Sequence, residues 1–154
     1  LARNLRPQIL DDLGLHAALQ WLARTATNEH GPQISMDAEG LPESLDSELA
    51  TLVFRIAQES LNNALKHAQA QTIVLRLYER ARMLHILVVD DGIGFDVNAA
   101  LASASQGVSS GLASMRERVR LFGGQLQMIS AEGEGTQLRI ALPLVDIDSG
   151  TPLP

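Results

Sequence analysis

A long run without glycine or proline, from Glu43 to Ala70, constrains the fold of this chain more than any other feature. Because neither residue interrupts the run, it can form one continuous helix. Its apolar residues repeat at helical spacing, as in Leu49, Leu52, Val53 and Ile56. This pattern predicts an amphipathic helix from about Asp46 to His67, with one face in a core.

The same helix carries a stripe of polar residues near its end. Glu59 and Asn63 are four residues apart, and Lys66 and His67 follow three and four positions later. On a helix this spacing aligns an acid, a neutral oxygen ligand and a cation, each step rising about 6 Å. A solvated helix face has a similar composition, so the stripe alone does not establish a site.

A second segment combines an apolar strand with an acidic, glycine-rich end. The run from Met83 to Val89 is apolar on both faces, which is typical of a central strand, and it leads into Asp90-Asp91-Gly92-Ile93-Gly94. A carboxylate followed by two glycines lets the backbone pass close to a flat ligand. An Asp-Gly pair between strands is also typical of a hairpin turn. The helix and this segment together, in this order, are more specific than either alone.

The remaining elements predict the fold class. Asp11 or Asp12 can cap a first helix, whose apolar stripe is Leu15, Ala18, Leu19 and Leu22. Gly31-Pro32 would end this helix. Strands are expected at 33–36, 72–79, 83–89, 125–130 and 136–142, with a hairpin at 79–82 and a helix at 111–122. This order does not fit alternating βαβ units, and half-polar strands predict a sheet covered on one face. We therefore expect an α+β fold, a two-layer α/β sandwich.

Composition excludes several classes of function. The 154 residues suit one domain, and 45% hydrophobic with 19% charged residues is ordinary for a folded chain. A net charge of −6 without a basic cluster argues against nucleic acid as a partner. The absence of cysteine excludes disulfides, thiolate catalysis and cysteine-ligated metals. No apolar run reaches the ~18 residues that span a bilayer, no signal peptide is visible, and no membrane contact is expected. The start at Leu1 indicates a piece of a longer protein.

Taken together, the motifs resemble the ATP-binding catalytic domain of bacterial sensor histidine kinases, in the gyrase/Hsp90/histidine-kinase/MutL ATPase superfamily. The helix resembles the N box of that superfamily, and Asp90-x-Gly92-x-Gly94 its first glycine box. Two later stretches, Gly111 to Arg118 and Gly133-Glu-Gly-Thr136, are similar to later boxes. The similarity covers roughly residues 3 to 144. It implies a Bergerat-type ATP fold, with a mixed sheet and helices on one face.

Further residues resemble the nitrate-sensor/desaturase-sensor subclass. They are Glu59, Leu5-Arg-Pro7, Leu10-Asp-Asp-Leu-Gly-Leu15 and Met115-Arg-Glu-Arg118. The resemblance divides the chain into three parts. Residues 1–12 would end a dimerisation helix and its linker, 13–145 would form the catalytic domain, and 146–154 would be a disordered tail.

ATP and Mg²⁺ are the cofactors that the resemblance implies, and the helix would hold their phosphate end. Asn63 is the expected metal ligand, because Mg²⁺ takes only one or two protein ligands beside substrate phosphates. Glu59 is the expected catalytic residue, as a base or, as we favour, as a group that orients metal-bound water. Lys66 can contact a phosphate, and His67 either lines the phosphate pocket or merely ends the helix.

The strand side would hold the base. Asp90 can accept a hydrogen bond from the exocyclic amine of adenine, and Gly92 and Gly94 let the backbone approach the ring. The hydroxyl of Thr136 suits the same polar edge.

The lid side would hold the triphosphate. Gly111 and Leu112 would cap it at a helix N-terminus. Small and polar residues at 96–110 predict a long loop that is either functional or a floppy insert. Because it lies between two stretches that resemble nucleotide-binding boxes, the resemblance implies an ATP lid. Ser109 stands where many relatives carry glycine, which would loosen the hold on phosphate.

These inferences predict the catalytic domain of a two-component kinase. None of the four histidines, His16, His30, His67 and His85, is followed by Glu or Asp, as the acceptor histidine of the subclass is. The acceptor is therefore expected upstream of Leu1, and this chain should bind ATP without phosphorylating itself. The expected partners are its own dimerisation domain, within a homodimer, and a response regulator. The domain would be cytoplasmic, in a parent anchored in the inner membrane. The alternatives are a hydrolytic ATPase or serine kinase of the same superfamily, or a non-catalytic nucleotide-binding interaction module.

Overall fold

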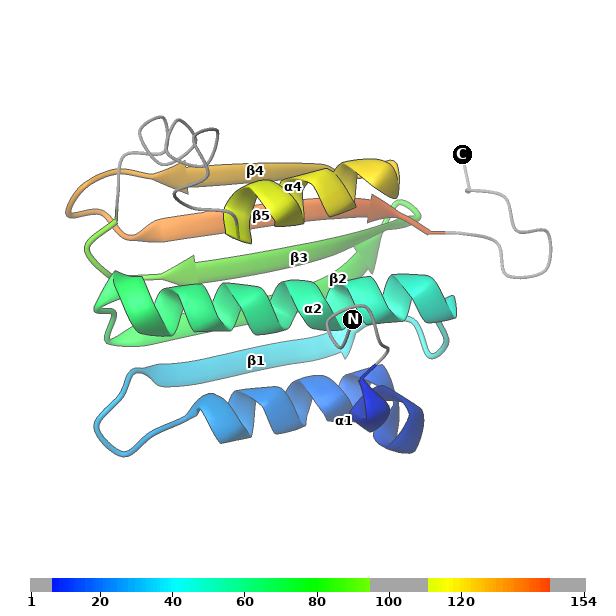
Figure 1. Cartoon of the computed structure of the whole chain (residues 1–154), viewed down its shortest axis with the longest axis horizontal. Coiled ribbons are helices and arrows are strands. Elements are labelled where there is room, and N and C mark those ends of the chain that lie inside the picture. The colour runs from blue at the N-terminus through cyan, green and yellow to red at the C-terminus, as the bar shows by residue number, and fades with distance from the viewer. Residues whose placement is uncertain (1–6, 95–110, 145–154) are drawn as a thin grey trace.

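The structure is a computed structural model that describes residues 7–94 and 111–144. Its elements, in chain order, are α1 (Gln8–Ala26), β1 (Gln33–Gly40), α2 (Ser47–Asn63), the π-helical turn η2 (Ala64–Ala68), β2 (Thr72–Arg80), β3 (Met83–Asp90), α4 (Gly111–Leu121), β4 (Gln125–Ser130) and β5 (Thr136–Pro143) (Figure 1). The predicted order of helices and strands is confirmed. The predicted lid at 96–110 and the predicted tail at 146–154 lie outside the described residues.

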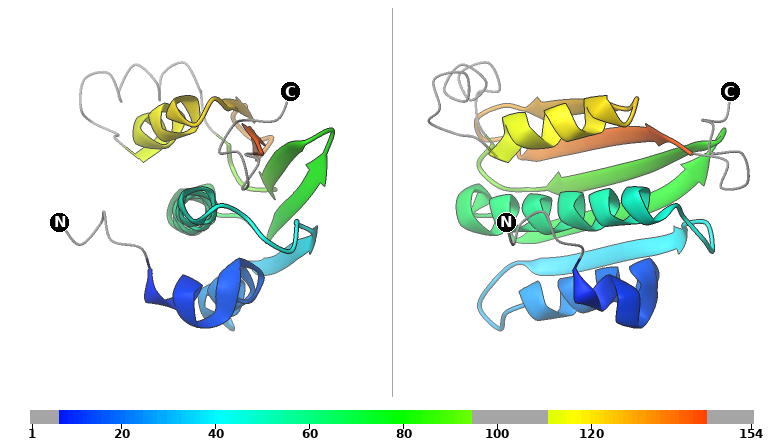
Figure 2. Two further views of the ribbon diagram at one scale, coloured as in Figure 1. Left: turned by 90° about the vertical axis from the view of Figure 1, so that its right-hand side faces the viewer. Right: turned by 45° about the vertical axis from the view of Figure 1, so that its right-hand side comes forward.

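The five strands form one mixed sheet in the order β1-β2-β3-β5-β4. β1 pairs with β2 in parallel, and the other neighbours are antiparallel. Helices α1, α2 and α4 all lie on one face of this sheet (Figure 2). The predicted two-layer α+β architecture is therefore confirmed.

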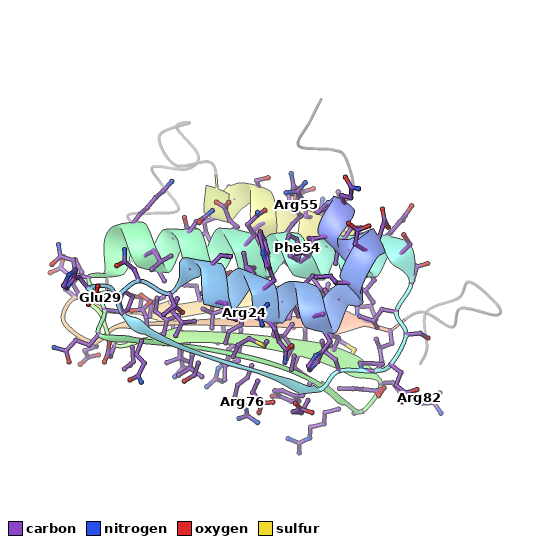
Figure 3. All side chains as sticks on the ribbon, turned by 90° about the horizontal axis from the view of Figure 1, so that it is seen from below. Arg24, Glu29, Phe54, Arg55, Arg76 and Arg82 are labelled. Carbon is purple, nitrogen blue, oxygen red and sulfur yellow. The ribbon has the colours of Figure 1, made fainter. Side chains whose placement is uncertain are left out.

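Strand alternation explains why the sheet is covered on one face. In β2, the residues Ile73, Leu75 and Leu77 are buried beneath the helices. The alternate residues face the other way, and Figure 3 shows Arg76 on the side of the sheet away from the helices. On that face Tyr78 stacks on His85 with ring centroids 5.1 Å apart. β3 lies at the centre of the sheet, as predicted, but its second apolar face is only half-buried among the described residues.

Helix α2 runs along the middle of the helical layer and supplies much of the core (Figure 1). Asp46 caps it, because its carboxylate accepts a hydrogen bond from the Glu48 backbone N–H at 3.2 Å. The buried face includes Leu49, Leu52, Val53, Phe54, Ile56 and Leu61. This face confirms the amphipathic helix that the apolar spacing predicts.

Three predicted boundaries are wrong. α1 begins at Gln8, directly after Pro7, and not at Asp11 or Asp12, because proline is well tolerated at a helix start. Gly14 interrupts this helix at φ 80°, a conformation that glycine adopts without strain. β1 extends to Gly40 because it pairs with β2 from Gln33 to Asp37 and, after a shift in register, again at Gly40.

The third boundary is the end of α2, which was expected to continue as a regular helix to His67. It instead passes into a π-turn at residues 64–68, and Gln69 then adopts a left-handed conformation at φ 50°. π-Turns of this kind are common at functional sites.

Candidate functional site

The elements that carry the predicted site residues meet at one end of the molecule. In Figure 1 the C-terminal end of α2, the end of β3 and the start of β5 lie at the left, and α4 begins at its end nearer to that side. The polar stripe of α2 and the acidic, glycine-rich segment after β3 therefore lie at the same end of the sheet. Residues 95–110, which connect β3 to α4, lie outside the described part of the chain.

Asp90 is a buried acid at the end of β3, only 9% exposed. In the sheet it lies between Ile73 on β2 and Thr136 on β5. Its carboxylate accepts hydrogen bonds from the backbone N–H of Gly92, at 2.9 Å, and of Thr136. Burial raises the pKa of Asp90 above its ordinary value of 3.8, and the two backbone hydrogen bonds offset part of that rise. Two oxygens with about four lone-pair sites still leave room for an external donor.

The loop after Asp90 packs directly on the turn that precedes β5. Gly94 has φ 66°, and a Cβ there would collide with the carbonyl oxygen of Ala131. Gly135 has φ 74°, and its Cβ would collide with the carbonyl oxygen of Asp90. The Gly133 N–H donates to the Ile93 carbonyl at 2.5 Å. Gly94 and Gly135 are therefore required by the contact between two backbone segments, a reason for glycine that the sequence motif alone did not indicate.

The hydroxyl of Thr136 is oriented by Ser130, a residue that the sequence analysis missed. Ser130 Oγ donates to the Gly135 carbonyl at 2.9 Å and lies 2.8 Å from Thr136 Oγ1. Because the single Ser130 proton goes to that carbonyl, the Thr136 hydroxyl donates to Ser130 and keeps its lone pairs for a ligand donor. The only sequence signal was a serine at an inward-facing position of β4.

The helical side places Glu59 against the start of α4. A Cβ on Gly111 would collide with Glu59 Oε1, so glycine leaves room for this carboxylate. Glu59 and Gly111 line one groove of about 300 Å³ between α2 and α4. The other lining residues are Leu52, Arg55, Ile56, Gln58, Ser114, Met115 and Arg118.

The other predicted residues on the helices are less enclosed. Asn63 is the last residue of α2 and is half-buried, whereas Lys66 is exposed in η2. Leu112 is half-buried in the first turn of α4. The side chain of His67 lies outside the described part of the structure.

Asp91 is a second residue that the sequence analysis did not select. Its carboxylate accepts hydrogen bonds from the Gln71 and Thr72 backbones and from the Thr72 hydroxyl. The bonds from Thr72, followed by that from Gln71, hold the pKa of Asp91 below its ordinary value of 3.8.

The lowered pKa of Asp91 gives a testable acid dependence. A carboxyl group whose pKa is lowered by folding stabilises the fold above its ordinary value of 3.8, and this stabilisation is lost as pH falls through the lower value of the folded state. We expect Asp91→Asn to be modestly less stable than wild type at pH 7 and the difference to shrink below pH ~4. Urea denaturation followed at several pH values measures this. A difference that grows towards low pH would contradict it.

Comparison with known proteins matches this chain to one ATPase family and to sensor histidine kinases. The family described as histidine kinase-, DNA gyrase B-, and HSP90-like ATPase matches residues 48–146, more than half of the chain. The sensor histidine kinase MctS of Rhizobium johnstonii is 37% identical over 143 residues. The sensor histidine kinase ComP of Bacillus subtilis is 34% identical over 141 residues. These matches cover 93% and 92% of this chain but only 30% and 18% of the two relatives.

A solved structure supports the fold. The blue-light activated histidine kinase of Erythrobacter litoralis EL346 matches 88% of this chain and 42% of its own, with a TM-score of 0.69 and 21% identity. No helix among the described residues is both long and apolar enough to cross a membrane.

Proposed function

Because the chain belongs to the family of histidine kinase-, DNA gyrase B- and HSP90-like ATPases, and matches sensor histidine kinases over nearly its whole length, we propose that it supplies MgATP for phosphorylation of a histidine outside this chain. The parent protein would then transfer the phosphoryl group to an aspartate of a response regulator. The domain would work in the cytoplasm, within a homodimer of the parent.

The buried Asp90 beside Thr136 is the observation that carries this proposal. Both groups present acceptors at the end of the sheet, because the Thr136 hydroxyl donates to Ser130. Adenine offers an amine donor on that edge, whereas guanine offers a carbonyl oxygen that a carboxylate would repel. Gly92 is buried beside Asp90 and, with Gly94, would form the backbone wall next to the base.

The residues on the helices fit the phosphate end of the same ligand. Among the described residues, no group of three or more His, Cys, Asp or Glu could hold a metal ion. The donor set fits Mg²⁺ through the neutral oxygen of Asn63, provided that nucleotide phosphates supply the other ligands. Bound Mg²⁺ would neutralise charge on the phosphates. Lys66 and His67 would line the phosphates, and the N–H groups of Gly111 and Leu112 would lie at the helix N-terminus that faces them.

Glu59 would have a supporting role in this scheme. Its carboxylate lies against Gly111, where it can orient a water molecule of the metal or take a proton. A hydrolytic ATPase would use the same glutamate as the base for an attacking water. Steady release of phosphate by this chain alone, lost in Glu59→Gln, would favour hydrolysis over the proposed kinase role.

Asn63→Ala tests the metal assignment. We expect the affinity for ATP in the presence of Mg²⁺ to fall about 10–150-fold, because one charge-assisted contact is worth about 1.5–3 kcal/mol. Affinity in EDTA should change less than two-fold. Isothermal titration calorimetry with a non-hydrolysable ATP analogue measures both values.

Asn62→Ala is the matched control, since Asn62 is exposed on the same helix one position earlier. It should bind as wild type does. An Asn63→Ala variant that keeps the full magnesium effect would remove Asn63 from the metal site.

A further inference from the structure

We propose that Asp91 is a positioning residue for the nucleotide pocket: it fastens the start of β2 to the end of β3 and so sets the separation between the helix end that carries Asn63 and Lys66 and the strand end that carries Asp90. The inference rests on the proposed function and deepens it. Asp91 needs no contact with the ligand for this role.

The contacts of Asp91 are unusually complete for an exposed side chain. Its Oδ1 accepts from the backbone N–H of Gln71, at 2.8 Å, and of Thr72, at 2.9 Å. Its Oδ2 accepts from the Thr72 hydroxyl at 2.9 Å. The backbone N–H of Asp91 also donates to the Thr72 carbonyl at 3.4 Å. An exposed carboxylate that only solubilised the surface would not collect three donors from two residues 19 and 20 positions away.

These bonds lie where three strands meet. Gln33, the first residue of β1, donates its N–H to the Gln71 carbonyl at 2.8 Å. Thr72 begins β2, and Asp91 follows the last residue of β3. We call Asp91 and its hydrogen bonds to Gln71 and Thr72 the clamp. The clamp connects the starts of β1 and β2 with the end of β3, at the end of the sheet that carries Asp90.

The clamp also fixes the end of the helix. η2 ends at Ala68, and only three residues separate it from Thr72. The first of them, Gln69, is held at φ 50°, a conformation that costs a non-glycine residue roughly 1 kcal/mol. Such a conformation persists only when its surroundings enforce it. With the start of β2 anchored by Asp91, this short link leaves the helix end little freedom relative to Asp90.

The affinity of a ligand that contacts both the helix end and the strand end with Asp90 should therefore depend on Asp91. The affinity of a ligand that contacts only one of them should not. MgATP would contact the helix end through its phosphates and Asp90 through its base. Adenosine would contact the base side alone. The contrast between the two ligands separates positioning from general loss of structure.

The experiment compares three variants of this chain with both ligands. Binding of a non-hydrolysable MgATP analogue is measured by calorimetry, and binding of adenosine by NMR titration. We expect Asp91→Ala to weaken the MgATP analogue about 5–20-fold, or about 1–2 kcal/mol, and adenosine less than two-fold, because the three lost hydrogen bonds act on the ligand only through the relative position of the two ends of the site. Thr72→Val removes only the hydroxyl contact, so the analogue should weaken about two- to five-fold.

Asp91→Asn is the rescue variant. Its amide oxygen can accept from both backbone N–H groups, and its amide nitrogen can donate to the Thr72 hydroxyl, which also accepts hydrogen bonds. Affinity for the MgATP analogue should stay within about three-fold of wild type. This variant distinguishes the geometry of the clamp from its charge.

Three results would overturn the inference: full affinity of Asp91→Ala for the MgATP analogue, equal losses for analogue and adenosine, or an Asp91→Asn variant as weak as Asp91→Ala. If Asp91→Ala does not fold, Thr72→Val and Asp91→Asn decide the question by the same contrast. A wild-type chain that binds neither ligand contradicts the proposed function and the inference with it. Normal wild-type binding with an unaffected Asp91→Ala contradicts the inference alone.

Discussion

Asp90→Asn is expected to lower the affinity for MgATP by about 100-fold or more while leaving the chain folded. The amide oxygen of asparagine can still accept the hydrogen bond that the Gly92 backbone N–H donates to Oδ1 of Asp90, so this contact after β3 is kept. The amide nitrogen, however, would then face the adenine amine, and two donors cannot pair. A lost charge-assisted hydrogen bond together with an unsatisfied buried donor is worth about 3 kcal/mol or more.

The same substitution should not reduce stability. Burial raises the pKa of Asp90, so the ionised carboxylate opposes folding as pH rises above its ordinary value of 3.8. Removal of the charge should leave the melting temperature at pH 7 unchanged or higher. The stability advantage of the variant should shrink as pH falls, because wild-type Asp90 then becomes neutral as well. Calorimetric melting and ligand titration on one preparation measure both effects.

Selectivity provides a third readout for Asp90→Asn. The amide nitrogen could donate to the carbonyl oxygen of hypoxanthine, so the preference for ATP over ITP should shrink or reverse. Asp91→Asn is the matched control, because it makes the same chemical change one residue later and should keep the preference for ATP. A variant at Asp90 that still binds ATP as wild type does would remove Asp90 from the base site.

Periodic features of the sequence predicted most of the fold. The apolar spacing of Leu49, Leu52 and Val53 placed the central helix, because burial of one helix face leaves a regular signal. Alternation in β2 predicted a sheet covered on one side only. The glycines at 90–94 predicted an unusual backbone after β3, and Gly94 does adopt a positive φ of 66° that favours glycine. The assignment of Asp90 to a base site remains a prediction.

Features that depend on single long-range contacts were not predictable in this way. Ser130 forms a hydrogen bond with Thr136, and Asp91 accepts one from Thr72. Neither contact produces a periodic pattern in the sequence. The break at Gly14 was missed because an isolated glycine is often tolerated inside a helical pattern. The π-turn after Asn63 was missed because its residues favour an ordinary helix just as well. These contacts of Ser130 and Asp91 were therefore visible only in the structure.

Gly135→Ala is expected to destabilise the chain by about 3 kcal/mol or more. Two costs combine at this position. Gly135 has φ 74°, which disfavours any residue with a Cβ by roughly 1–2 kcal/mol. The new Cβ would also collide with the carbonyl oxygen of Asp90. That oxygen belongs to the backbone of β3, where Asp90 pairs with Thr136, so it cannot move without breaking the strand pair.

Gly133→Ala separates the two costs. Gly133 has a similar φ of 81°, but a Cβ there meets nothing within 4 Å. The stability of this variant should fall only by the conformational cost of a positive φ, about 1–2 kcal/mol, and the variant should bind MgATP as wild type does. Gly135→Ala should lose more stability and, because Asp90 is displaced, most of its affinity as well. Urea denaturation of both variants measures the difference. Equal losses of stability with equal affinities would mean that the turn at 131–135 does not press against Asp90, and the base side of the site would then lack the support assigned to it here.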